Sequence, residues 1–266
     1  MAKAPEFHTL KDEYRRMWNS MQTDAGKDAS ITAAAKKVIA NRKRYEAVAK
    51  RCGSLVPWEF IGITHLMEAG GDFTRHPHNG DKLTARTWQV PAGRPEAGSP
   101  PFTWEESAYD CYGVFKKLGS VSDWSVEHTL YLAELFNGMG YRLYHPSDKS
   151  PYLWARTNHN DGTGKYVSDG KYDRNAPSEG QCGFAPVLKE VWRLTGKTSE
   201  GAVDLKAQDK ADMRKAGGIG AAVVVGTGAV ATQAPSSFPW LIVLGAVIGF
   251  VLVAATAAYW LNRGGK

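Results

Sequence analysis

The chain has 266 residues, a formal net charge of +6 and 43% apolar residues, an ordinary share for a globular protein. This length allows one sizeable domain with additional segments. The positive charge favours an anionic partner such as a cell-wall polymer or a phospholipid surface, and because no nucleic-acid-binding motif accompanies it, we expect no nucleic acid partner. The three cysteines are odd in number and lack CxxC spacing, which argues against a disulfide framework.

The first part of the chain is predicted to be helical. Residues 1–8 contain no apolar stretch, so we expect no export signal there. From residue 10 to residue 51 the sequence is rich in helix formers with scattered charges. The lysines and arginines of this segment are better explained as a solvated helix face than as a binding patch.

Glu68 is the most informative residue of the next predicted helix, residues 57–68. It closes an apolar run that Pro57 opens, and a glycine-rich break follows it. On a helix, Ile61, Thr64 and Glu68 share one stripe, so Glu68 projects from an apolar side. Apolar surroundings raise the pKa of a carboxyl group, which is what a glycosidase acid needs to protonate a leaving sugar oxygen near neutral pH.

A β-hairpin is predicted after this helix. Asn79-Gly80 is a strong two-residue turn signal, and residues 81–90 then read as a strand on which Asp81 and Thr87 face the same side. An acid, a carboxylate and a hydroxyl would thus converge between helix and hairpin. The alternative is that Glu68 only ends a helix and Asp81 only shapes a turn.

Metal binding is not expected at this hairpin. His76 and His78 alternate onto one strand face, as metal ligands do, but no third ligand stands at a familiar spacing. We therefore predict neither a metal nor another cofactor.

Further elements follow in order. Residues 91–101 are too rich in proline and glycine for regular structure, and Thr103 with Glu106 forms a capping box for a helix that runs to about residue 118. Asp123 or Ser125 caps a helix that ends at Phe136, before glycines. A second short hairpin is predicted around Asp169-Gly170, and a last helix at about 184–194 closes a domain of residues 1–195.

The C-terminal part differs in character. Residues 196–215 form a charged linker, and residues 216–262 contain no charged residue. Residues 240–261 are long and apolar enough to span a bilayer, and residues 217–234 are a weaker second span. Flanking positive charges place the N-terminal domain in the cytoplasm if there are two spans, and outside the membrane if there is one. The GxxxG match at residues 245–249 favours a homo-oligomer in the membrane.

Seven ordered segments together resemble one known family. They are His65-Leu-Met-Glu68, residues 78–87 with 90–95, Thr103-Trp-Glu-Glu-Ser-Ala108, Phe136-Asn-Gly-Met-Gly-Tyr141, Ser150-Pro-Tyr-Leu-Trp154, residues 164–170, and Gln181-Cys-Gly183. Over residues 8–195 the chain resembles the lysozyme-family proteins of bacteria and their phages, sometimes described as holin-associated N-acetylmuramidases. The resemblance implies a lysozyme-like α+β fold, mainly helical with a small β-hairpin, and cleavage of the MurNAc–GlcNAc linkage of peptidoglycan glycan strands.

The resemblance also assigns site residues. Phage lysozymes use a Glu, Asp and Thr triad, which Glu68, Asp81 and Thr87 match by element; because the Glu68–Asp81 interval is longer than in the best-known phage lysozymes, Asp72 competes for the second place. The turn at Asn137 resembles the sugar-contacting loop of goose-type lysozymes and lytic transglycosylases. Asn137 is expected to contact sugar on this ground. Among aromatic residues, Tyr141, Tyr152, Trp154 and Tyr166 could stack on sugar rings, with Trp154 and Tyr141 the better candidates, although each alone is more often a core residue. The sugar-binding residues we predict are Asn137, Tyr141, Tyr152 and Trp154.

Two alternatives to a hydrolase remain open. If no second carboxylate reaches Glu68, this residue acts first as acid and then as base, which gives the anhydro product of a lytic transglycosylase. A non-enzymatic holin or wall-binding membrane protein is the other alternative. In each case we expect the chain to sit at the bacterial inner membrane through its C-terminus, with its N-terminal domain cytoplasmic or periplasmic according to the number of spans.

Overall fold

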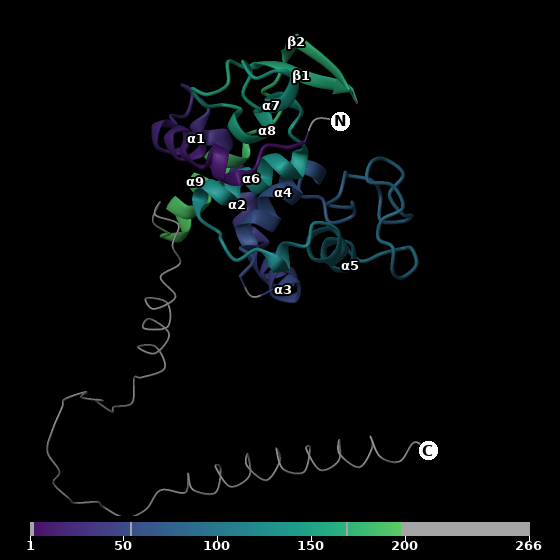
Figure 1. The fold of residues 1–266 in the computed structure, drawn as a ribbon. Coiled ribbons are helices and arrows are strands. Elements are labelled where there is room, and N and C mark those ends of the chain that lie inside the picture. Colours follow the sequence, from purple (N-terminus) through teal and green to yellow (C-terminus); the bar gives the residue numbers. More distant parts are fainter. Residues whose placement is uncertain (1–2, 54, 169, 198–266) are drawn as a thin grey trace, which may run out of the picture. The chain divides into compact units, whose positions relative to one another are not determined.

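The computed structural model describes residues 3–53, 55–168 and 170–197 (Figure 1). The membrane segment expected at 216–262 and nearly all of the linker expected at 196–215 lie outside these residues. Within the described ranges, no helix has the length and apolar character needed to cross a bilayer.

The described residues form an α+β structure that is about half helical, as the sequence predicts. Two strands, β1 (Thr163–Ser168) and β2 (Lys171–Pro177), pair as an antiparallel sheet. The helical elements are α1 (Phe7–Ser20), α2 (Asp28–Ala40), α3 (Arg42–Cys52), α4 (Trp58–Ala69), α5 (Trp104–Ala108), the π-helix η1 (Tyr109–Phe115), the 3₁₀ turn η2 (Leu118–Ser120), α6 (Val126–Asn137), α7 (Gly140–Tyr144), α8 (Pro151–Trp154) and α9 (Phe184–Thr195).

Helix α4 is the central element. It packs against α2, α3, α6 and α9, so ten of its twelve residues are buried and its sequence is apolar nearly all round (Figure 1). Pro57 precedes its first turn, and Gly70 ends it in the left-handed conformation at a φ of 63°, which a residue with a side chain rarely adopts. These two signals fix the ends of the helix and place Glu68 in its last turn.

The predicted strand at residues 81–90 is wrong. A short antiparallel contact does follow α4, since Arg75 and Lys82 form an isolated bridge and the His76 N–H donates to the Asp81 carbonyl at 2.7 Å. Beyond it the chain runs irregularly to Thr103, on one side of the helices in Figure 1. Of the expected turn pair only Gly80 has a positive φ, so the turn is not the two-residue type on which the strand prediction depended.

Other local predictions are confirmed. The Thr103 side chain accepts from the Glu106 N–H and the Glu106 carboxylate accepts from the Thr103 N–H, which completes the capping box. The hairpin predicted around Gly170 is β1–β2, with Tyr166 opposite Tyr172.

The helix predicted after the capping box differs from the structure. It does not continue to residue 118, because α5 gives way to the π-helix η1 after five residues. All three cysteines are free thiols.

Candidate functional site

Glu68 lies where the sequence places it, at the end of a buried helix. Protein surrounds its carboxyl group on most sides, yet part of the side chain remains accessible to solvent. The Tyr152 hydroxyl donates a hydrogen bond to Glu68 Oε1 at 2.9 Å. Burial raises the pKa of Glu68 to about 7, against smaller lowering effects of the Tyr152 hydrogen bond and the Lys116 charge. The group therefore titrates near neutral pH.

The residues beneath Glu68 explain this desolvation. Tyr112 and Cys111, both from η1, are fully buried and close enough for the charge of Glu68 to raise the pKa of each, although burial is the larger cause. The Tyr112 hydroxyl donates to the Ile61 carbonyl at 3.2 Å and accepts from the Thr64 hydroxyl at 2.9 Å. The polar atoms on this side are thus paired with each other, so they leave the carboxyl group poorly solvated.

Lys116 is a site residue that the sequence reasoning missed. Its backbone N–H donates to the Cys111 carbonyl, five residues earlier, at 2.9 Å, and this wider π-helical turn decides where its side chain lies. The ammonium group donates to the Phe136 carbonyl at 3.2 Å and lies 4.4 Å from the centroid of the Phe136 ring. Burial lowers the pKa of Lys116, and the nearby Glu68 charge opposes that shift. Because a π-turn has no clear sequence signal, no pattern in the chain pointed to this residue.

The Asp81 carboxylate is engaged by the loop that follows it. Its Oδ2 accepts from the backbone N–H groups of Trp88 and Gln89 at 2.9 and 3.0 Å, and its Oδ1 accepts from the Gln89 side-chain amide at 2.8 Å. Burial would raise the pKa of Asp81, but these hydrogen bonds to the ionised form outweigh it and lower the pKa. Asp81 is therefore an ionised carboxylate that holds residues 88 and 89.

The Thr87 hydroxyl is engaged in the same way. It donates to the Pro91 carbonyl at 2.5 Å and accepts from the Arg94 N–H at 2.8 Å, and its side chain is buried. Asp72, the competing carboxylate, is exposed and accepts from the backbone N–H and hydroxyl of Thr74 at 2.9 and 2.7 Å. These hydrogen bonds lower the pKa of Asp72.

The structure thus brings Glu68 together with Tyr152 and Lys116. Among the carboxyl groups that the structure describes, none is a cause of the Glu68 pKa shift, and this includes Asp81 and Asp72. The turn before Asp81 does lie against the helix end, since a Cβ added to Gly80 would come 2.8 Å from the Glu68 carbonyl oxygen. What adjoins Glu68 on this side is the backbone of the turn.

A buried polar cluster anchors the irregular segment between α4 and α5. The Arg94 guanidinium donates to both oxygens of Asp110 in η1 at 2.8 Å each, and His78 Nε2 lies 3.1 Å from the same carboxylate. His76 bonds instead to the Ser107 hydroxyl, at 2.6 Å, and to the Ala85 carbonyl. The histidine pair therefore has a structural role, and the described part of the chain contains no group of three residues able to hold a metal ion.

The four expected sugar-binding residues have different surroundings. Asn137 is exposed at the end of α6, and Tyr152 is the hydrogen-bond partner of Glu68. Trp154 is 1% exposed and belongs to the core, so its ring cannot stack on a sugar in this conformation. Tyr141 is buried too, and its hydroxyl accepts from the Tyr166 N–H at 3.3 Å. Sequence alone could not separate core aromatic residues from exposed ones here.

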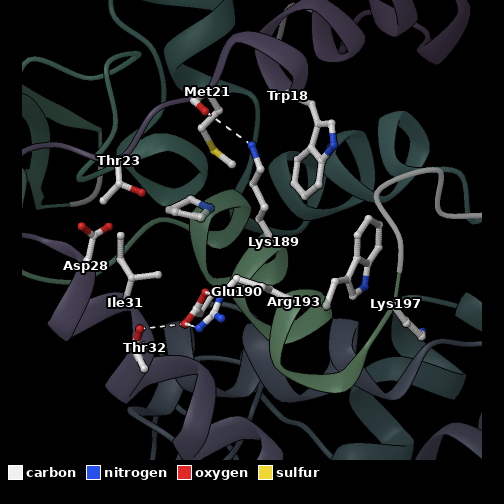
Figure 2. Close-up of a pocket in the computed structure, with 12 residues that line it drawn as sticks. Trp18, Met21, Thr23, Asp28, Ile31, Thr32, Lys189, Glu190, Arg193 and Lys197 are labelled. Carbon is white, nitrogen blue, oxygen red and sulfur yellow. Dashed lines mark hydrogen bonds and ion pairs between the residues drawn. The ribbon is translucent and has the colours of Figure 1, made fainter.

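A cavity of about 570 Å³ lies elsewhere, between α1, α2 and α9 (Figure 2). Its lining includes Trp18 and Trp192 but neither Glu68 nor Tyr152 nor Lys116. Glu190, at its edge, accepts from Thr32 and pairs with Arg193, which lowers the pKa of this carboxylate. A paired, ionised carboxylate of this kind is a poor acid, so we place the candidate chemistry at Glu68 rather than in this cavity.

Comparison of the chain with protein-family models, with curated proteins and with solved structures returned no match.

Proposed function

We propose that this protein cleaves the glycan strands of peptidoglycan at the MurNAc–GlcNAc linkage, with Glu68 as the general acid. The observation that carries the proposal is a carboxyl group whose pKa is about 7, at the end of a buried helix and on a residue that is partly exposed. Such a group is protonated at slightly acidic to neutral pH and can donate its proton to a leaving sugar oxygen. The resemblance of residues 8–195 to lysozyme-family proteins supplies the substrate class.

The environment of Glu68 suits both halves of such a reaction. In the first half the carboxyl group gives up its proton as the glycosidic bond breaks, and the Tyr152 hydroxyl and the Lys116 charge favour the resulting carboxylate. When Glu68 acts alone, that carboxylate then accepts a proton from the attacking hydroxyl and returns to its starting state. Tyr152 and Lys116 are therefore positioning residues in this proposal.

Two versions of the reaction differ in the attacking group and in the product. With Asp81 as base or electrostatic stabiliser and Thr87 positioning a water, the water attacks as the glycosidic bond breaks and gives its proton to Asp81 or to solvent, and the product is a hydrolysed strand with inverted configuration. With Glu68 acting alone, the muramyl 6-hydroxyl attacks and the product is the anhydro sugar of a lytic transglycosylase. Because the polar atoms of Asp81 and Thr87 are already hydrogen-bonded within the loop, the geometry favours the second version.

The proposed location of the protein is argued from its sequence. The charge-free residues 216–262 support a C-terminal anchor in the bacterial inner membrane, with the N-terminal domain on the side set by the number of spans. Reporter fusions at both ends of the chain test this part of the proposal. A periplasmic N-terminal domain would suit wall remodelling, whereas a cytoplasmic one would suit lysis after the membrane is breached.

The activity is tested with the purified full chain, in detergent, on isolated sacculi. We expect release of soluble fragments, and mass spectrometry separates the two versions because the anhydro product is lighter by one water. Glu68→Gln should reduce release by about a hundredfold or more, while Glu106→Gln, an exposed capping residue at which Gln also serves, should retain it. Full activity of Glu68→Gln would overturn the assignment. Binding of the wild-type protein to sacculi without release would indicate a wall-binding module instead.

A further inference from the structure

Trp88 differs from the other tryptophans in the described part of the chain. Of these seven residues, five are buried, Trp124 is partly buried, and Trp88 alone is exposed, with 77% of its surface accessible. The other six each contact another aromatic ring or a cation, whereas within the described residues no such contact involves Trp88. Its ring therefore adds little to the core, and an exposed indole of this kind is a frequent anchor for a binding partner.

The backbone that carries Trp88 is held firmly. Its N–H donates to the buried Asp81 carboxylate, and the next residue, Gln89, is held by that carboxylate through both its N–H and its side chain. Thr87, just before it, closes the loop by bonding to Pro91 and Arg94. The exposure of the indole is thus built into an ordered loop, so a ligand that binds it need not order the loop first.

A short series of contacts connects the Trp88 backbone to the end of α4, which carries Glu68. Its N–H is bonded to Asp81, and the preceding Gly80 packs against the Glu68 carbonyl. On the opposite flank of the same loop, the Arg94 guanidinium lies 5.2 Å from the centroid of the Phe115 ring, and Phe115 directly precedes Lys116. The segment that presents Trp88 therefore touches the end of α4 at the Glu68 backbone and, through Arg94, the residue before Lys116.

We infer that Trp88 is a stacking subsite for a sugar ring of the glycan strand, on the segment of residues 80–101 that packs on the end of α4 at Gly80. The inference rests on the proposed function and names a part of its substrate contact. A β-1,4-linked amino sugar presents apolar C–H groups on its ring faces, and these pack against the electron-rich face of an indole. Such a contact positions the strand across Glu68 without touching the reacting atoms.

The neighbours of Trp88 indicate which sugar rings this subsite would accept. The Gln89 side-chain amide is bonded to Asp81, and the Asn79 amide donates to the Gln89 carbonyl at 3.0 Å. Because these polar groups are already paired, the subsite supplies affinity through the ring and few hydrogen bonds to sugar substituents. We therefore expect it to accept GlcNAc and MurNAc rings alike.

Binding is measured on the full-length Glu68→Gln variant, which removes cleavage from the experiment. The probe is soluble glycan strand freed of its stem peptides. Three substitutions are each added to the Glu68→Gln parent: Trp88→Ala, Trp88→Phe and Val90→Ala. Val90 is the matched control, because it lies on the same loop and is 83% exposed. We expect Trp88→Ala to weaken binding about tenfold or more, Trp88→Phe to restore most of it, and Val90→Ala to bind like the parent.

Each outcome is decisive. Unchanged binding by Trp88→Ala, an equal loss in Val90→Ala, or no binding of glycan by the parent would each overturn the subsite. If Trp88→Ala binds normally while the wild-type protein still cleaves sacculi, the subsite fails and the proposed function stands. If binding depends on Trp88 but the wild-type protein does not cleave, the subsite stands and the proposed activity fails.

Discussion

At the scale of single residues, Glu68 is defined by opposing influences on one carboxyl group. Burial raises its pKa, whereas the Tyr152 hydroxyl and the Lys116 ammonium favour the ionised form. The wild-type rate on sacculi should therefore fall as the pH rises above about 7, because the acid form of Glu68 is lost.

Replacing Lys116 tests this account. Lys116→Met removes a charge that lowers the Glu68 pKa, so we expect the alkaline fall in rate to move to higher pH. Lys117→Met is the matched control, because Lys117 is the next residue, is exposed, and is not a cause of the Glu68 shift. The measurement is the rate of fragment release from sacculi against pH. An alkaline fall that stays in place, or one that Lys117→Met moves equally, would contradict the role given to Lys116.

At the scale of elements, the segment between α4 and α5 shows why a carboxylate and a hydroxyl with structural roles match the pattern of catalytic residues. Carboxylates and hydroxyls near turns commonly accept hydrogen bonds from backbone N–H groups. A segment without regular strand or helix pairing needs many such acceptors. Asp81 and Thr87 perform this task here, and Arg94 with Asp110 fastens the segment to η1 across sixteen residues. Sequence alone could not separate the two roles, because the partners become neighbours only after folding.

Asp81→Asn distinguishes the two roles. If Asp81 holds the loop, the substitution loses one or two hydrogen bonds, so amide exchange at Trp88 and Gln89 should speed up while fragment release falls no more than about tenfold. If Asp81 is a catalytic base, release should fall by about a hundredfold or more. Asp72→Asn is the control, because Asp72 is an exposed carboxylate in the same segment.

At the scale of the whole molecule, features with local causes were predictable and features with distant causes were not. The ends of α4, the capping box at Thr103 and the β1–β2 hairpin each follow from residues within a few positions of one another. The hydrogen bond between Tyr152 and Glu68 joins residues 84 positions apart. It forms only because α8, which carries Tyr152, packs beside α6 and α9. The sequence therefore pointed to Glu68 as a candidate acid but not to the groups that set its pKa.

The same acid should make the molecule less stable at alkaline pH. The pKa of Glu68 rises from 4.5 to about 7 on folding, so its contribution to stability is fully present below pH 4.5 and is lost as the pH rises through 7. Glu68→Gln removes this loss while keeping an acceptor for Tyr152, so it should unfold at higher urea concentration than the wild-type protein at pH 8 and similarly at pH 4.5. The shift in pKa corresponds to about 3 kcal/mol at most. Glu106→Gln is the opposite case, because the hydrogen bonds from Thr103 lower the Glu106 pKa. Any difference in stability between this variant and the wild-type protein should therefore become smaller as the pH falls. A Glu68→Gln variant that is less stable at pH 8 would mean that ionised Glu68 is stabilised by the fold, and would remove the physical basis for treating it as an acid with a raised pKa.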